Sequence, residues 1–142
     1  MILILINGTM NSATLFFDHE KLIAYQRAIG FAAWASQLLE RLPGKLSVAD
    51  QLERASTSVA LNIAEGNAKF TAPDRCRYLD TARGSALESA ACLDILVAKN
   101  KCTVEEVYEG KRLLHETVSL LVGLTKSVSP ERLREDGPPY GS

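Results

Sequence analysis

Three short motifs that begin helices divide this chain into segments. In each, a hydroxyl residue is followed three positions later by an acid: Ser47 with Asp50, Thr71 with Asp74, and Thr103 with Glu106. In such a capping box the hydroxyl oxygen accepts from a free backbone N–H of the first turn, and the acid complements the helix dipole. Pro43 and Gly44 end any helix before the first motif. We therefore expect an all-α chain with helices over residues 18–41, 48–66, 72–99 and 104–128.

Apolar residues recur at helical spacing on the second and third segments, as core-facing stripes do. These stripes are Leu52, Ala55, Val59 and Ile63, then Leu79, Ala82, Ala86, Ala90, Leu93 and Val97. The third segment is also dense in small residues, which let a neighbouring helix approach closely. The chain has 142 residues, 46% of them hydrophobic and only 6% aromatic. This balance favours one compact domain of packed helices.

The fourth segment carries two apolar stripes, although a single bundle core needs one. We assign the first to the core: Val104, Val107, Leu114, Val118 and Leu121. The second is Leu113, Leu120 and Leu124. It requires burial against another subunit, or cover from a loop or tail of the same chain.

The two ends of the chain differ in composition from the segment between them. Residues 1–16 are predicted to be a partly disordered N-terminal extension, 17–128 the four-helix bundle, and 129–142 a mobile tail rich in charge, Pro and Gly. The apolar run over residues 1–6 is too short for an export signal or a membrane span. We therefore expect no membrane association. Cys76, Cys92 and Cys102 show no CxxC spacing, so we expect free thiols in a reducing cytoplasm.

No pattern in the chain indicates an enzyme. His19 has no second His four residues later, and His115 stands alone on a helix flank. The glycines form neither GxGxxG nor GxxxxGK[ST]. Glu105 and Glu109 lie one turn apart and could be read as a general acid-base pair. They stand at a helix start, however, where acids are expected because they stabilise the helix dipole. We predict no catalytic residue, no metal ligand and no cofactor.

A group of polar residues borders the predicted core on the second and third helices. Its members are Ser58, Asn62, Glu65 and Gly66, and then Arg83, Gly84, Ser85 and Glu88. The first interpretation is a set of inter-helix hydrogen bonds and ion pairs that fix register, for example Arg83 with Glu65. The second is a polar pocket or a partner contact at the same place.

The formal net charge of -1 gives no chain-wide attraction to phosphates, so a nucleic-acid site must be a local patch. The most basic region lies around the junction of the second and third helices. Its cations are Lys69, Arg75, Arg77 and Arg83. A ring of identical subunits would sum the field of this patch, and Tyr78 within it could offer a stacking face. The alternative is an ordinary solvated helix start.

Three strings in the chain resemble a known bacterial family. They are FDHEKL with YQ over residues 17–26, QLxRAxxSVxxNIAEG over 51–66, and YLxxARGSxxE over 78–88. The resemblance runs from about Phe17 to Thr125. It is to the four-helix-bundle proteins first noticed inside intervening sequences of large-subunit rRNA genes.

The resemblance implies an antiparallel up-down four-helix bundle that assembles into a homopentameric ring and has no catalytic site. A related branch, the accessory proteins of diversity-generating retroelements, implies a basic surface for nucleic acid and a reverse transcriptase or other protein as partner. The balanced charge of this chain departs from that branch. We predict a non-enzymatic oligomeric scaffold that contacts RNA, DNA or a nucleic-acid-associated partner through its basic patch. The alternative is a protein-interaction ring with no affinity for nucleic acid.

Overall fold

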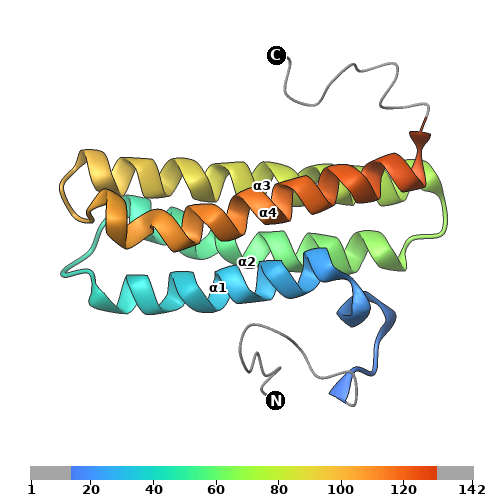
Figure 1. The fold of residues 1–142 in the computed structure, drawn as a ribbon, viewed down its shortest axis with the longest axis horizontal. Helices are drawn as coiled ribbons and strands as arrows, with labels where there is room; N and C mark the ends of the chain where they lie inside the picture. Colours follow the sequence, from blue (N-terminus) through green and yellow to red (C-terminus); the bar gives the residue numbers. More distant parts are fainter. Residues whose placement is uncertain (1–13, 131–142) are drawn as a thin grey trace.

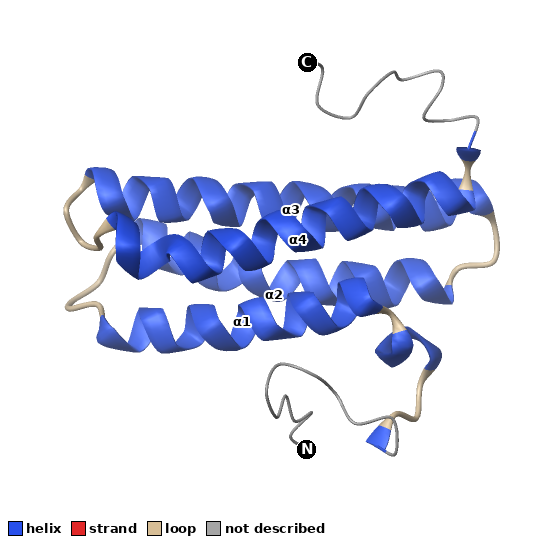
Figure 2. Cartoon of the chain, viewed as in Figure 1, coloured by secondary structure: helices blue, strands red, loops and turns tan. Residues whose placement is uncertain are grey.

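The computed structural model describes residues 14–130. This part of the chain contains a 3₁₀-helix, η2 (Asp18–Lys21), and the helices α1 (Ile23–Arg41), α2 (Ser47–Ala68), α3 (Ala72–Ala98) and α4 (Val104–Val128). All regular structure in Figure 2 is helical, so the predicted all-α class and the four helices are confirmed. Most of the predicted extension and tail, residues 1–13 and 131–142, lies outside the described residues.

The four α-helices lie side by side, and consecutive helices are joined at alternating ends of the molecule (Figure 1). The α2–α3 turn stands at one end, and the α1–α2 and α3–α4 connections stand at the other. Gly44 in the α1–α2 connection adopts a φ of 69°, a conformation that glycine reaches without strain. The most extensive helix pair is α2 with α3. The junction between these two helices is therefore well supported by packing.

The cap of α4 forms as predicted, and that of α3 forms in part. The Thr103 hydroxyl accepts from the Glu106 N–H at 3.1 Å, and the Glu106 carboxylate accepts from the Thr103 N–H at 2.7 Å. The Thr71 hydroxyl likewise accepts from the Asp74 N–H at 3.3 Å. The Asp74 carboxylate, however, accepts from Arg77.

The predicted capping box at Ser47 is wrong. Leu46 is the N-cap residue, and Ser47 is already the first residue of α2. The Leu46 carbonyl accepts from both the Ala49 and the Asp50 N–H, which places the helix start one residue earlier. The N-cap of α2 therefore makes no side-chain hydrogen bond.

The predicted single helix over residues 18–41 is also wrong, because Leu22 separates η2 from α1. Leu22 has φ -73° and ψ 126°, which is extended backbone. The Glu20 carboxylate accepts from the Phe17 N–H at 3.0 Å, and the Gln26 side chain donates to the Glu20 carbonyl at 3.0 Å. These bonds hold η2 as a separate turn at the start of the bundle.

The core lies between the four helices, and the predicted stripes supply it. The stripe on α2 is buried along its whole length, and that on α3 is buried except at Ala90 and Val97, which are half-buried. Val104 differs from the prediction, because it is the first residue of α4 and 63% exposed. The remaining members of its stripe are buried.

The second stripe of α4 packs against the core of its own subunit. Leu113, Leu120 and Leu124 are all half-buried there. Leu120 and Leu124 also line a shallow groove that includes Leu22 and Ala24 at the start of α1. These residues are thus partly covered without a second subunit.

Gly110 accommodates the Trp34 side chain between α1 and α4. A Cβ at this position would overlap the six-membered ring of Trp34, which packs against the core and stacks on Phe31. We expect Gly110→Ala to lower the free energy of unfolding by about 1–3 kcal/mol despite the better helix propensity of Ala. Because the chain contains one Trp, its fluorescence reports the displacement directly. An unchanged emission maximum and an unchanged denaturation midpoint would contradict this account; Gly123→Ala, where a Cβ meets open space, is the matched control.

Candidate nucleic-acid interface at the α2–α3 turn

The α2–α3 turn is held by hydrogen bonds on both sides of Phe70. The Lys69 N–H donates to the Gly66 carbonyl at 3.2 Å and closes the end of α2. Thr71 caps α3, and its carbonyl accepts from the Arg75 N–H at 3.0 Å. The turn is therefore short and well defined, and Phe70 at its centre is 100% exposed.

Gly66 allows the two helices to approach closely just below this turn. A Cβ on Gly66 would lie 3.0 Å from the Tyr78 Cβ and 3.2 Å from the Arg75 carbonyl oxygen. Because the second of these atoms is backbone, a larger residue would push the start of α3 away from α2. The glycine in the NIAEG string therefore places Arg75 and Tyr78 against the end of α2.

Lys69 and Arg77 both lie against the ring of Tyr78. The Lys69 Nζ is 5.0 Å from the ring centroid and the Arg77 Cζ is 4.7 Å from it, distances typical of cation–π contacts. Each cation also has an acidic neighbour, with Lys69 3.6 Å from Glu65 and Arg77 3.4 Å from Asp74. The half-buried Tyr78 is thus engaged by two cations and positions them, rather than offering the open stacking face that we expected.

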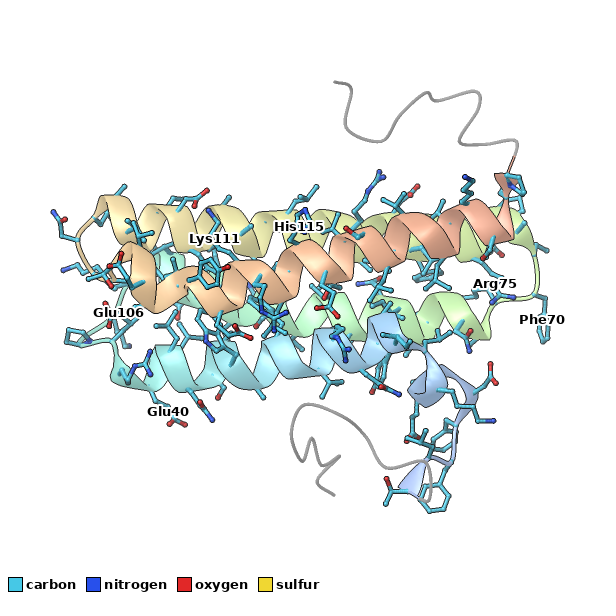
Figure 3. All side chains as sticks on the ribbon, viewed as in Figure 1. Glu40, Phe70, Arg75, Glu106, Lys111 and His115 are labelled. Carbon is cyan, nitrogen blue, oxygen red and sulfur yellow. The ribbon has the colours of Figure 1, made fainter. Side chains whose placement is uncertain are left out.

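Arg75 joins three elements at this end of the bundle. Its guanidinium donates to the Asn67 side chain at 3.4 Å, and Asn67 donates to the Asp18 carboxylate of η2 at 3.1 Å. The Arg75 Nε is buried and has no hydrogen-bond partner within the described residues. Figure 3 shows Arg75 beside Phe70 at the same end of the molecule. We call the set Lys69, Phe70, Arg75 and Arg77 the turn surface.

Arg83, the fourth predicted contact, lies farther along α3. It is eight residues beyond Arg75, about 12 Å along the helix axis, and is half-buried. The suggested Arg83–Glu65 ion pair is absent from the described part of the chain, because Glu65 is exposed and pairs with Lys69 instead. The structure therefore gathers three of the four predicted cations.

The polar group between α2 and α3 is centred on two serines. The Ser58 and Ser85 hydroxyls lie 2.8 Å apart and join the helices. The Asn62 amide donates to the carbonyl and to the hydroxyl of Ser58, both at 2.9 Å, so it supports this link from within α2. Glu88 and Gly84 are exposed, and nothing in the structure explains why position 84 is glycine. The first interpretation of this group, a set of inter-helix bonds, fits the serines alone.

The Ser58–Ser85 contact can be measured as a coupling energy. We expect a double-mutant cycle with Ser58→Ala and Ser85→Ala to give about 0.5–1.5 kcal/mol in denaturant unfolding, because this is the net value of a typical hydrogen bond. Thr57→Ala with Ser85→Ala is the control cycle, since the exposed Thr57 bonds only to its own helix at Glu53. Equal coupling in the two cycles would show that the serine contact contributes nothing specific.

The described residues show no arrangement typical of metal or thiol chemistry. No group of three or more His, Cys, Asp or Glu side chains there could hold a metal ion. Burial, with a smaller effect of Glu88, raises the pKa of the Cys92 thiol. Burial and Glu106 raise the pKa of Cys102 against the opposing effect of Arg41. Both thiols therefore favour the neutral, unreactive form. Within residues 14–130, no helix combines the length and the apolar character needed to cross a membrane.

Phe70 is the residue that sequence reasoning missed at this site. Its signal was its position, between the last residues of one helix and the N-cap Thr71 of the next. An aromatic residue placed in a short turn has few ways to be buried, and basic residues flank it on both sides. Together these signals could have pointed to an exposed aromatic side chain within a basic segment, but Phe70 was not among the predicted contacts.

Comparisons with known proteins agree on the fold. The family model described as 23S rRNA-intervening sequence protein matches residues 20–123. The crystal structure of a protein with unknown function, from the S23 ribosomal protein family of Bacteroides thetaiotaomicron, has a TM-score of 0.70 to this chain. The two are 21% identical over an alignment that covers 73% of this chain and 99% of the other. A search of curated proteins gives no match. The family match spans most of the bundle, and the chain therefore belongs to the 23S rRNA-intervening sequence protein family.

Proposed function

We propose that this chain is a non-enzymatic, self-assembling bundle protein of the cytoplasm that binds RNA through the turn surface. The observation that supports this most is that Lys69, Arg75 and Arg77 lie at the same turn as a fully exposed Phe70, with Lys69 and Arg77 against the ring of Tyr78. Aromatic and cationic side chains together are the usual components of nucleic-acid contacts.

The acids beside the cations do not prevent this role. Both Arg77 and its partner Asp74 are more than half exposed, and Lys69 pairs with an exposed Glu65. Exposed ion pairs of this kind contribute only about 0–1 kcal/mol. Breaking these pairs to contact a phosphate therefore costs little pairing energy, although the carboxylates remain nearby and oppose the anion. Several copies of the surface on one assembly would add their fields.

The experiment is a fluorescence anisotropy titration of labelled structured RNA with the full chain at low and at higher salt. We expect binding that weakens with salt, and that weakens further in the variant Arg75→Ala with Arg77→Ala. Lys99→Ala with Lys101→Ala is the matched control, because it removes two exposed cations at the opposite end of α3. Equal weakening in both variants would show that the effect comes from the charge of the whole chain and not from the turn surface, and flat titrations would exclude RNA binding.

We also propose that the unit of assembly is an antiparallel up-down bundle and that five copies form a ring. Leu87, Val104 and Tyr108 are 45%, 63% and 65% exposed and line two adjoining hollows between α3 and α4, Leu87 one of them and Val104 and Tyr108 the other. Exposed apolar side chains of this size favour burial against another copy. Val104 and Tyr108 belong to the start of α4, at the opposite end from the turn surface, so an interface there leaves that surface free.

Light scattering after chromatography tests the assembly. We expect a mass about five times the 15.5 kDa of one chain. Val104→Asp with Tyr108→Ser should shift the mass toward one chain without changing the helical circular dichroism, because both side chains are exposed. A mass of 15.5 kDa for the unmodified chain would contradict the proposal.

The second candidate function is a protein-interaction ring with no affinity for nucleic acid. The balanced charge and the exposed apolar side chains of Leu87, Val104 and Tyr108 on α3 and α4 favour it. Its partner would be a reverse transcriptase or another protein. Flat RNA titrations together with an oligomeric mass would make this candidate the better account.

A further inference from the structure

Phe70 is the most exposed large hydrophobic side chain among the described residues. It projects from the end of the bundle, beyond the last turns of α2 and α3 (Figure 3). A small polar residue would serve this turn equally well, since neither flanking helix uses the ring for packing. Within residues 14–130, Phe70 therefore has no packing role.

The backbone around Phe70 is held in place before any partner arrives. The hydrogen bond from the Lys69 N–H to the Gly66 carbonyl ends α2, and the Thr71 cap begins α3. Gly66 also allows the two helices to pack closely. A side chain presented on such a turn loses little backbone freedom on binding, which favours affinity.

The surroundings of Phe70 indicate the chemistry of its partner. Phosphate contacts would come from the side chains of Lys69, Arg75 and Arg77, because the first turn of α3 offers a poor anion site. Pro73 has no N–H there, the Asp74 N–H is capped by Thr71, and the Asp74 carboxylate repels anions. Cations that can bind phosphates, next to an exposed aromatic ring, suit a nucleotide whose base stacks on that ring.

We propose that Phe70 stacks on an unpaired base, so that the turn surface selects single-stranded segments, loops or bulges of RNA over duplex. This rests on the proposed RNA-binding function. In a duplex the faces of the bases are covered by their neighbours, whereas an unpaired base can turn out and lie on the ring. The flanking phosphates then meet Lys69 and Arg77, which Tyr78 holds in place.

The test compares labelled oligouridine with a fully paired RNA duplex as probes for the full-length chain. We expect the single strand to bind more tightly, and Phe70→Ala to weaken its binding by about fivefold to a hundredfold. Phe70→Tyr keeps the aromatic face and should keep the affinity. Duplex binding should change little in either variant. An oligonucleotide with 2-aminopurine should lose fluorescence on binding to the unmodified chain and keep it with Phe70→Ala.

The other outcomes separate this inference from the proposed function. If Phe70→Ala binds both probes like the unmodified chain while Arg77→Ala weakens them, RNA binding stands and the stacking role is overturned. If Phe70→Ala leaves RNA binding intact and lowers the mass in light scattering, a second copy of the chain covers Phe70 and the inference is again overturned. If neither probe binds at any salt concentration, the RNA-binding function fails together with the stacking role.

Discussion

Replacing Phe31 by Ala is expected to lower the free energy of unfolding by about 3–5 kcal/mol. Phe31 lies in the middle of α1, is 0% exposed, and stacks on Trp34 with ring centroids 5.8 Å apart. Truncation removes its buried apolar surface and leaves a cavity that the helices can only partly close. Denaturant unfolding followed by circular dichroism gives the value.

Phe70→Ala is the matched control, because it makes the same chemical change at a side chain that is 100% exposed. We expect its unfolding midpoint to stay close to that of the unmodified chain. Similar losses in the two variants would contradict the placement of Phe70 outside the core. If the unfolding midpoint of Phe70→Ala is unchanged, the variant is folded and can be used in the binding experiments.

Reversing the charge at Lys69 and Arg77 together is expected to weaken RNA binding about a hundredfold or more at low salt. Each Lys or Arg to Glu change alters the charge by two, so the formal net charge falls from -1 to -5. The variant also leaves Glu65 and Asp74 without their present cationic partners, which makes the turn repel phosphates. The slope of log affinity against log salt should fall in magnitude by about two.

The control for this prediction is Lys99→Glu with Lys101→Glu, which produces the same net charge at the other end of the bundle. When the two pairs are compared at 0.1 M salt, we expect this pair to change the affinity much less, because exposed charges farther apart than about 10 Å are then largely screened. If both pairs weaken binding equally, the effect comes from the charge of the whole chain. The turn surface would then have no special part in binding.

The positions of the helices could be predicted because their signals are local. The Thr103 box, the Thr71 cap and the Pro43–Gly44 stop act within a few residues, and each lies where the sequence places it. Ser47 and Leu22 were mispredicted. At Ser47 the helix begins one residue before the motif indicates, with Leu46 as its N-cap. At Leu22 the backbone is extended, and the bonds of Glu20 to Phe17 and Gln26 hold η2 apart from α1.

The candidate site could be predicted only in part, because it depends on which residues the α2–α3 turn brings together. The sequence placed the cations in one segment, but helix rise separates Arg83 from the others. The pairing of Glu65 with Lys69, and the contact of two cations with Tyr78, depend on side-chain directions that spacing alone does not give. The need for glycine at position 66 comes from the close approach of α3, a tertiary contact that the sequence alone does not give.

The most direct test of the central claim is to map where RNA touches the protein. We would crosslink RNA containing 4-thiouridine to the unmodified full-length chain and identify the crosslinked peptides by mass spectrometry. Cleavage after Lys69 and Arg75 releases residues 70–75 as one peptide, which contains Phe70. We predict that crosslinks concentrate on this peptide and on its neighbours in the turn surface, and that they decrease with salt. Crosslinks that map to the opposite end of the bundle, or none at all, would contradict the claim.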